Sequence, residues 1–410
     1  MKNTNNLLKV GIFLTWDYSL KTWEDSGTLE REVKLFKKLH EDKNIEFTFY
    51  SYGNNDDLKF RNKFDFINVI PLYENWRPTS RFVRFLYSLL IPIRFSKQLG
   101  NLDILYQNQL LGAWVPIFIK YLKRKPLIIR TGYDMLEFAI NDSKSRSLIN
   151  LYKILTYISV IASDTYTVSN HSDLKRFEYR YPKQKNKFLL RPNWVDVLKS
   201  ENISVRKVNK ILTVGRVVEQ KNFSYLISEF SNTKGKFSID IVGEGPQKEN
   251  LEKLALQRNV QVNFLGRVNH SELLSSYKEY KFFISTSYYE GNPKTLLEAM
   301  AAGCVVFASD ISNHRELITN SNDGFLFQFD KGSLMSIFND YSNKDLELTK
   351  ISKKAIQKNT SVTRYIILIF IIFIYTFMTS QIYLENYNTH FQISVLLIFL
   401  LNLYKNLINE

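Results

Sequence analysis

The feature that most constrains this fold is an alternation of strand-like and helix-like segments that occurs twice along the chain. In the first 190 residues, short apolar runs are separated by longer segments such as Glu30–His40, whose apolar residues recur at helical spacing. Strands that alternate with helices form parallel, doubly wound sheets. The expected strands of this part are Leu8–Thr15, Ile45–Tyr50, Ile67–Pro71, Asp103–Tyr106, Leu127–Arg130 and Asp164–Ser169.

The alternation stops near Arg191–Asp196, where a polar run from Lys199 to Lys210 begins, and then resumes. The sequence therefore predicts two α/β domains of Rossmann-like type. We place the first at residues 1–197, a linker at 198–209 and the second at 210–345. The strands expected in the second domain are Lys210–Gly215, Ser238–Val242, Val260–Leu265, Lys281–Ser285 and Val305–Ala308.

The end of the chain has a different composition. Tyr365–Leu384 is nearly continuous apolar sequence, and its twenty residues would span roughly 30 Å as a helix, the thickness of one bilayer core. A second apolar run, Phe391–Tyr404, is shorter. Lysines precede the first run and follow the second, whereas the turn between them has no Lys or Arg. We therefore expect a membrane segment at 363–404, either a hairpin with both ends in the cytoplasm or one span plus an interfacial helix.

The net charge of +15 has three interpretations. A nucleic-acid reader is not expected, because the basic residues are scattered and no reading module is recognisable. A basic, lysine-rich surface is the simplest interpretation. An anionic membrane surface together with an anionic substrate accounts better for the charge. Arg81–Arg94 and Trp114–Lys125 combine cations with large apolar residues, and are read either as leaflet-binding segments or as core helices with basic ends.

Two glutamates in the segment Glu290–Glu298 indicate a ligand site. An apolar strand precedes Glu290, and a helix is predicted to begin between the two glutamates, with Pro293 in its first turn, and to stop at Gly303. Free amides at the start of this helix would bind an anion, and the carboxylates would bind sugar hydroxyls. A nucleotide-sugar needs both kinds of contact.

A cationic pair follows the first strand of the second alternation. Gly215 ends that strand, and Arg216 and Lys221 stand on the loop after it, where open α/β sheets bind ligands. A forked guanidinium and a point-charge ammonium suit a diphosphate. They would stabilise the negative charge that grows on a departing nucleoside diphosphate. The alternative interpretation is a pair of surface cations.

Four segments in order resemble the group 1, or family-4, retaining glycosyltransferases. EGNPKTLLEAMAAGCVVFASDISNHRELI looks like the donor-site signature of that family, and ILTVGRVVEQKNFSYLI looks like its phosphate-binding Arg/Lys element. FSIDIVGEGPQKENLEKLA and VNFLGRVNHSELLSSY lie between them in the family's order. The resemblance covers residues 7–335 and implies the GT-B architecture, two Rossmann-like domains facing across a cleft.

The resemblance also implies roles for individual residues. Glu298 would bind the ribose hydroxyls, and Glu290 would face the donor sugar. Gly291 and Asn292 would contact the sugar and diphosphate through their amides. Gly27 would stand for the family's glycine loop near the donor phosphate.

On the acceptor side, the resemblance points to Arg130 or Asp134. Many family members carry a histidine in this region, and here there is none. No Asp-x-Asp stands where a divalent ion would bridge a diphosphate, and the five histidines are dispersed, so metal-independent transfer without a cofactor is expected. Family members usually end with a helix that crosses back to the first domain, whereas here lysine-rich sequence at 344–363 leads into the apolar tail.

The function expected from these features is transfer of a sugar from a UDP- or GDP-sugar to a glycan or lipid-linked acceptor in surface polysaccharide biosynthesis. We expect it at the cytoplasmic face of the inner membrane. Two alternatives remain open at this point. One is a nucleotide-sugar hydrolase or epimerase of the same fold, which would act on the donor without an acceptor. The other is a non-catalytic, membrane-anchored relic of a glycosyltransferase.

Overall fold

A computed structural model describes residues 7–43, 45–74, 76–193, 195, 203–233 and 235–359. Contacts divide the chain into two compact units, residues 1–363 and 364–410. The second unit, and with it most of the membrane segment predicted at 363–404, lies outside the described residues. Within the described residues, no helix is both long and apolar enough to cross a bilayer.

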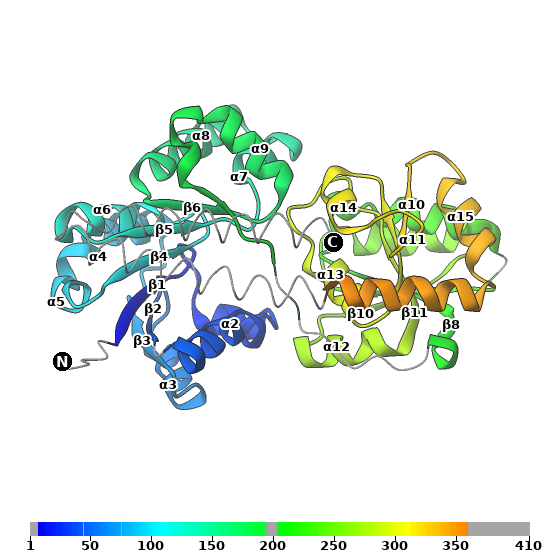
Figure 1. Cartoon of the computed structure of the whole chain (residues 1–410), viewed down its shortest axis with the longest axis horizontal. Helices are drawn as coiled ribbons and strands as arrows, with labels where there is room; N and C mark the ends of the chain where they lie inside the picture. Colours follow the sequence, from blue (N-terminus) through cyan, green and yellow to red (C-terminus); the bar gives the residue numbers. More distant parts are fainter. Residues whose placement is uncertain are drawn as a thin grey trace, which may run out of the picture. The chain divides into compact units, whose positions relative to one another are not determined.

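The first half of the chain, from β1 to β7 (residues 8–190), folds into a seven-stranded sheet in which every strand pairing is parallel (Figure 1, blue to green). The strands are almost wholly buried, as expected for a parallel sheet covered by helices. Their order across the sheet is β3 (Ile67–Pro71), β2 (Ile45–Ser51), β1 (Leu8–Phe13), β4 (Ile104–Asn108), β5 (Leu127–Arg130), β6 (Thr165–Val168) and β7 (Phe188–Leu190).

The second half forms a six-stranded sheet, again with parallel pairing throughout. Its first strand lies between β9 and β11, so the order of strands reverses beside it. This reversal creates a switch point at the carboxyl edge of the sheet, where open α/β sheets bind ligands. The order is β10 (Gln261–Gly266), β9 (Ser238–Val242), β8 (Lys207–Val214), β11 (Tyr280–Ser285), β12 (Val305–Ser309) and β13 (Phe325–Phe327).

Helices cover these sheets and bury alternate strand residues against them. In the first half, Phe13, Leu105 and Ile129 pack with apolar residues of the helices on one face. The helices are α1 (Leu20–Asp25), α2 (Leu29–Lys43), α3 (Lys59–Lys63), α4 (Arg81–Arg94), α5 (Ser96–Gly100), α6 (Trp114–Lys123), α7 (Met135–Asn141), α8 (Arg146–Ala162) and α9 (His171–Arg180).

The second sheet has a separate hydrophobic core on each face. Phe282 and Phe307 pack toward one of these cores, whereas Phe283 and Val306, their neighbours along the strands, pack toward the other. The helices are α10 (Phe223–Glu229), α11 (Lys248–Arg258), α12 (His270–Glu279), α13 (Lys294–Ala301), α14 (Ser312–Leu317) and α15 (Ser333–Tyr341).

The lysine-rich segment before the apolar tail is largely helical, over residues 345–359. Leu348 and Ile351 of this helix are buried in one core of the second sheet, and Ala355 in the other. Lys358 forms an ion pair with buried Asp323 at 2.8 Å. This helix therefore completes the packing of the second half.

The two parallel Rossmann-like sheets confirm the predicted α/β class. Two short strands, β7 and β13, had not been anticipated. Strand β8 begins at Lys207, inside the segment assigned to the linker. Contacts group both sheets within residues 1–363, so the boundaries at 197 and 210 stay predictions.

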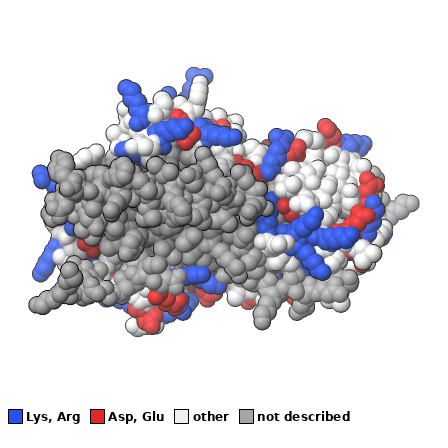
Figure 2. Space-filling model, in the orientation of Figure 1, with Lys and Arg blue, Asp and Glu red and all other residues white. Residues whose placement is uncertain are grey.

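Charged side chains are mixed on the surface. On the face shown in Figure 2, lysines and arginines are interspersed with aspartates and glutamates over the described parts of both halves. Among the described residues visible on that face, the basic side chains do not form one continuous patch.

Candidate functional site

Two loops of the second half meet at the carboxyl edge of neighbouring strands β8 and β11. The hydroxyl of Thr286 donates to the carbonyl of Lys221 at 2.8 Å, and the side-chain amide of Gln220 donates to the carbonyl of Tyr289 at 2.7 Å. The backbone amide of Tyr288 donates to the carbonyl of Gln220 at 2.9 Å. These bonds fix the predicted cationic loop beside the predicted glutamate loop.

Lys221 and Glu290 form an ion pair at this junction. Both side chains are largely buried, with exposed fractions of 15% and 9%. Ser287 also donates to the Glu290 carboxylate, at 2.6 Å. Burial alone would raise the pKa of Glu290, but the ammonium of Lys221 and these hydrogen bonds hold that pKa below its ordinary value. Glu290 is therefore a carboxylate at neutral pH.

Arg216 stands at the mouth of the same junction. Its side chain is exposed, and among the described residues its guanidinium has no hydrogen-bond or ion-pair partner. Gly215 precedes it, and a Cβ there would lie 2.9 Å from Cε of Lys221. The glycine thus lets the lysine side chain lie across the end of β8, with its ammonium on Glu290.

The helix after Glu290 begins one residue later than predicted. Pro293 is the N-cap of α13 rather than a first-turn residue, and Gly303 follows the helix with φ +80°. The backbone amides of Gly291 and Asn292 have no partner among the described residues. A Cβ on Gly291 would lie 2.7 Å from the carbonyl oxygen of Gly132, so a loop of the first half closely approaches this point.

Glu298 lies in the second turn of α13 and is 2% exposed. Its carboxylate contacts Nε2 of His270 at 3.0 Å and accepts from the hydroxyl of Tyr277 at 3.3 Å. Arg31 of α2 lies 3.6 Å away. Burial would raise the pKa of Glu298, but the contacts of His270 and Arg31 hold it low. Glu298 is not part of the wall of the cavity described next.

A cavity of about 760 Å³ joins these features to the first half of the chain. Its wall includes Gly215, Arg216, Lys221, Glu290, Gly291 and Asn292 from the second half. The first half contributes Thr15, Gln109, Tyr133 and other residues. Six cationic side chains line the cavity against three carboxylates, so the site carries a surplus of positive charge. Such a cavity is large enough for a nucleotide-sugar and suits its charge.

Of the two residues predicted for the acceptor side, Arg130 lines the cavity and Asp134 does not. The side chain of Asp134 is buried as the N-cap of α7 and pairs with Arg180 at 3.1 Å. Asp134 is therefore a capping residue of α7, and the acceptor-side role offered for Arg130 or Asp134 stays a prediction. The position of Asp134 directly before a helix was the signal for a capping role.

Gly27 also lies outside the cavity wall, although its neighbour Thr28 is part of that wall. With φ +68°, Gly27 packs against the loop before α12, where a Cβ would lie 3.2 Å from the carbonyl oxygen of Val268. Its assignment to the donor phosphate stays a prediction.

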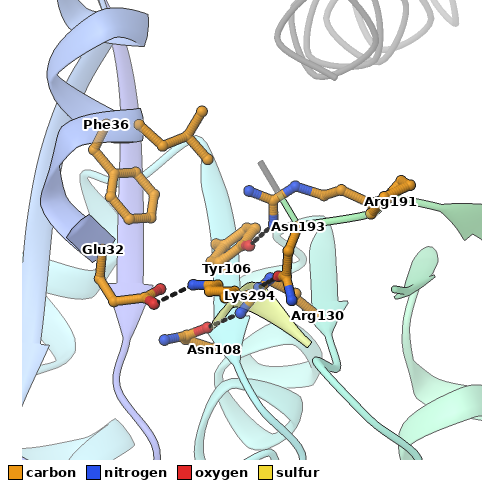
Figure 3. Close-up of a pocket in the computed structure, with 10 residues that line it drawn as sticks. Glu32, Phe36, Tyr106, Asn108, Arg130, Arg191, Asn193 and Lys294 are labelled. Atoms are coloured by element: carbon orange, nitrogen blue, oxygen red, sulfur yellow. Dashed lines mark hydrogen bonds and ion pairs between the residues drawn. The ribbon is translucent and has the colours of Figure 1, made fainter. Parts of the chain in front are cut away.

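Sequence reasoning missed a polar cluster beside the cavity, drawn in Figure 3. Glu32 of α2 bonds to Lys294, the first residue of α13, and Arg130 donates to Asn108 at 3.1 Å and to Asn193 at 2.9 Å. Arg191 bonds to the hydroxyl of Tyr106. Lys294 stands within the donor-site motif, but nothing in the sequence linked it to Glu32, 262 positions earlier.

Part of this chain resembles a known protein family and several known proteins. Residues 196–358 match the model of the family described as "Glycosyl transferases group 1". The chain is 32% identical over 157 residues to the O-antigen biosynthesis glycosyltransferase WbnH of Escherichia coli, an alignment that covers 37% of this chain and 44% of that protein.

A second relative comes from Campylobacter jejuni and is named GalNAc-alpha-(1->4)-GalNAc-alpha-(1->3)-diNAcBac-PP-undecaprenol alpha-1,4-N-acetyl-D-galactosaminyltransferase. It is 29% identical over 181 residues, which cover 43% of this chain and 49% of the relative. The chain thus spans less than half the length of each of these relatives.

Among solved structures, the fold resembles that of Anabaena Alr3699/HepE in complex with UDP and glucose. The TM-score is 0.69 at 15% identity, over 91% of this chain and all of that one. At this identity the likeness establishes the fold alone, which is the two-sheet GT-B arrangement.

Proposed function

This chain belongs to the glycosyl transferases group 1 family, whose model its residues 196–358 match, and from that premise we propose that it is a retaining glycosyltransferase. It moves a sugar from a UDP- or GDP-sugar to a glycan or lipid-linked acceptor. The observation that carries this proposal is the placement of Arg216, Lys221 and Glu290 in the wall of one cavity, beside the amino end of α13.

The cations act on the leaving group. As the bond between sugar and diphosphate breaks, negative charge grows on the diphosphate. Exposed Arg216 offers a forked donor, Lys221 a point charge, and the amides of Gly291 and Asn292 are free among the described residues. Groups fixed before the reaction stabilise this charge without reorganising. Glu290 holds Lys221 in place and offers its carboxylate to sugar hydroxyls.

Glu298 is proposed to bind the ribose of the nucleotide. His270 and Tyr277 hold its carboxylate from behind, and Arg31 covers it from the first half. Nucleotide binding on this proposal displaces Arg31 from Glu298, because the ribose hydroxyls need the same oxygens. No residue is assigned as general base.

The names of the relatives guide the proposal for the acceptor. One is an O-antigen biosynthesis enzyme, and the name of the other contains a glycan linked to undecaprenol through a diphosphate. We extend this to a surface polysaccharide intermediate as the acceptor of this chain, bound at the cytoplasmic face of the inner membrane.

Exposed apolar side chains of the first half support membrane contact. Phe82 and Ile93 of α4 are 69% and 64% exposed, and Tyr121 of α6 is similarly open. Helices α4 and α6 pack side by side, and basic residues stand at their ends (Figure 1). Apolar side chains with flanking cations suit an anionic leaflet.

A thermal-shift screen tests the proposed donor. The detergent-solubilised chain is heated with UDP, GDP and a panel of their sugars, and one nucleotide class is expected to raise the melting temperature. Glu298→Ala, assayed in parallel, should lose most of that shift. A chain whose melting temperature responds to no nucleotide would contradict donor binding.

An acceptor test separates transfer from hydrolysis. Donor turnover is measured with and without a membrane extract that supplies acceptors. Turnover that depends on the extract supports transfer, whereas equal turnover without it would favour a hydrolase or epimerase.

A further inference from the structure

Arg130, in the cluster shown in Figure 3, is held in place by hydrogen bonds to neutral side chains and not by an ion pair. Arg130 donates to two amide oxygens, those of Asn108 and Asn193, and among the described residues no carboxylate lies within ion-pair distance of it. Asn193 is itself fixed by Asn292, whose carbonyl accepts from Nδ2 at 2.7 Å. A guanidinium held rigidly by neutral groups keeps its charge for a ligand.

Two further cations add to this charge. Lys294 and Arg31 both lie against Glu32, and Arg31 is shared with Glu298. The field of Lys294, Arg31 and Arg130 holds the pKa of Glu32 far below its ordinary value, despite burial. Burial lowers the pKa of Lys294 to about 8, with Arg31 and Arg130 acting in the same direction. The cluster thus has more positive charge than Glu32 balances.

The cluster opens toward the substrate cavity. Arg31, Arg130 and Lys294 all line the cavity of about 760 Å³, which also contains Arg216 and Lys221. A second, smaller pocket that Arg130 and Lys294 also line has a volume of about 20 Å³, room for roughly one water molecule. An anion must therefore meet these cations from the cavity side.

We propose that Arg130, Lys294 and Arg31 form a second anion site, which binds a phosphate or carboxylate group of the acceptor. This rests on the proposed function, in which Arg216 and Lys221 are occupied by the diphosphate of the donor. The acceptor class that follows is an anionic one, such as a sugar attached to a lipid diphosphate or a glycan ending in an acidic sugar. An uncharged acceptor would leave Arg130, Lys294 and Arg31 balanced only in part, by Glu32 and Glu298.

Titration calorimetry of the detergent-solubilised full chain tests the site. The protein is first saturated with UDP, or with GDP if that is the nucleotide bound, and then titrated with inorganic pyrophosphate or glucuronate. One further equivalent of at least one of these anions should bind. Arg130→Gln should weaken that binding at least about tenfold, because charge-assisted hydrogen bonds are lost. Arg258→Gln, an exposed arginine at the end of α11, should bind as the wild type does.

Three results would overturn the proposal. The first is that neither anion binds to the nucleotide-saturated protein. The second is that Arg130→Gln binds the anion as tightly as the wild type does. The third is that Arg216→Gln loses as much affinity as Arg130→Gln, which would place the anion at the donor site. An unchanged affinity for the nucleotide shows that Arg130→Gln is folded. If Arg130→Gln does not fold, Lys294→Met is used as the test variant in its place.

A different result would contradict the proposal that the protein binds a nucleotide-sugar donor. A protein that binds neither UDP nor GDP contradicts the proposed function. The second site is then tested by pyrophosphate alone, since Arg130→Gln must weaken binding and Arg258→Gln must not.

Discussion

At the scale of single residues, Lys221 has two roles, one in catalysis and one in stability, and two variants distinguish them. It is proposed to stabilise the leaving diphosphate, and it neutralises buried Glu290. Lys221→Gln should therefore lower transfer by about 10²- to 10³-fold. It should also lower the melting temperature, because a buried carboxylate loses its cation.

The double variant Lys221→Gln/Glu290→Gln resolves the two effects. It should regain much of the thermal stability, since no unpaired charge remains, yet transfer should stay low. Initial rates of sugar transfer and melting curves measure both quantities. Lys248→Gln, at an exposed position of α11, is the control. Recovery of transfer in the double variant would show that Lys221 acts only through Glu290.

Lys294 should give the protein a pH-dependent stability. The pKa of Lys294 falls from 10.5 to about 8 on folding, because burial, Arg31 and Arg130 outweigh the attraction of Glu32. Between about pH 8 and 10, the unfolded chain therefore holds a proton that the folded chain has released. The contribution of Lys294 to the free energy of unfolding thus rises with pH across this window.

Melting temperatures measured from pH 7 to 10 test whether the stability rises with pH, as this argument predicts. The wild type should gain stability relative to Lys294→Met as the pH rises above 8. Lys207→Met, at an exposed lysine, should follow the wild-type curve. Parallel curves for the wild type and Lys294→Met would be evidence against a shifted pKa.

The sequence predicted those site residues that lie in short contiguous segments. Arg216 and Lys221 share one loop, and Glu290, Gly291 and Asn292 share another, so the position of the flanking strands was enough to bring them to one edge. The pairing of Glu32 with Lys294 depends on how α2 meets α13, which no local pattern encodes. Asp134, which was offered together with Arg130 for the acceptor side, is a buried helix cap, because a polar residue after a strand can cap a helix as well as bind a ligand.

At the scale of elements, the first turn of α9 is bound by a residue of another helix in addition to its own N-cap, Asn170. Glu316 of α14 accepts from the backbone amides of His171 and Ser172, both at 2.7 Å. These amides belong to the first turn of α9 and lack partners within their own helix. Glu316→Ala should therefore cost about 1 kcal/mol of stability, the usual cost of losing a cap.

Urea denaturation measures this cost as a shift in the midpoint at constant slope. Glu316→Gln keeps one acceptor oxygen and should lie between the wild type and Glu316→Ala. Glu252→Ala changes an exposed glutamate in the middle of α11 and should shift the midpoint little. If Glu316→Ala denatures at the wild-type midpoint, the cap contributes nothing measurable.

Longer strands, including the edge strands β3 and β10, were predicted, whereas the two three-residue strands were missed. β1, β5 and β9 are buried on both faces, so their apolar runs stand out from polar surroundings. β7 and β13 have three residues each and lie at the ends of their sheets, where one neighbour is enough to define them. A three-residue run carries too little pattern to be told from a loop.

At the scale of the whole molecule, membrane contact has two candidate sources. One is the apolar sequence at 365–404, outside the described residues. The other is the exposed apolar surface of α4 and α6, which belongs to the compact unit of residues 1–363. Removing the first source isolates the second, because the shortened chain keeps both sheets and the buried helix at 345–359.

Vesicle sedimentation of residues 1–363 measures the contribution of that surface. Binding is expected to anionic vesicles, to weaken with salt and to be low on zwitterionic vesicles, because apolar contact and charge attraction act together. Phe82→Ser/Ile93→Ser should release the unit from anionic vesicles. Leu256→Ser, which removes an 83% exposed leucine from α11, should not. If the unit stays in solution with anionic vesicles, α4 and α6 are not the contact, and attachment of the full chain must come from the sequence after residue 363.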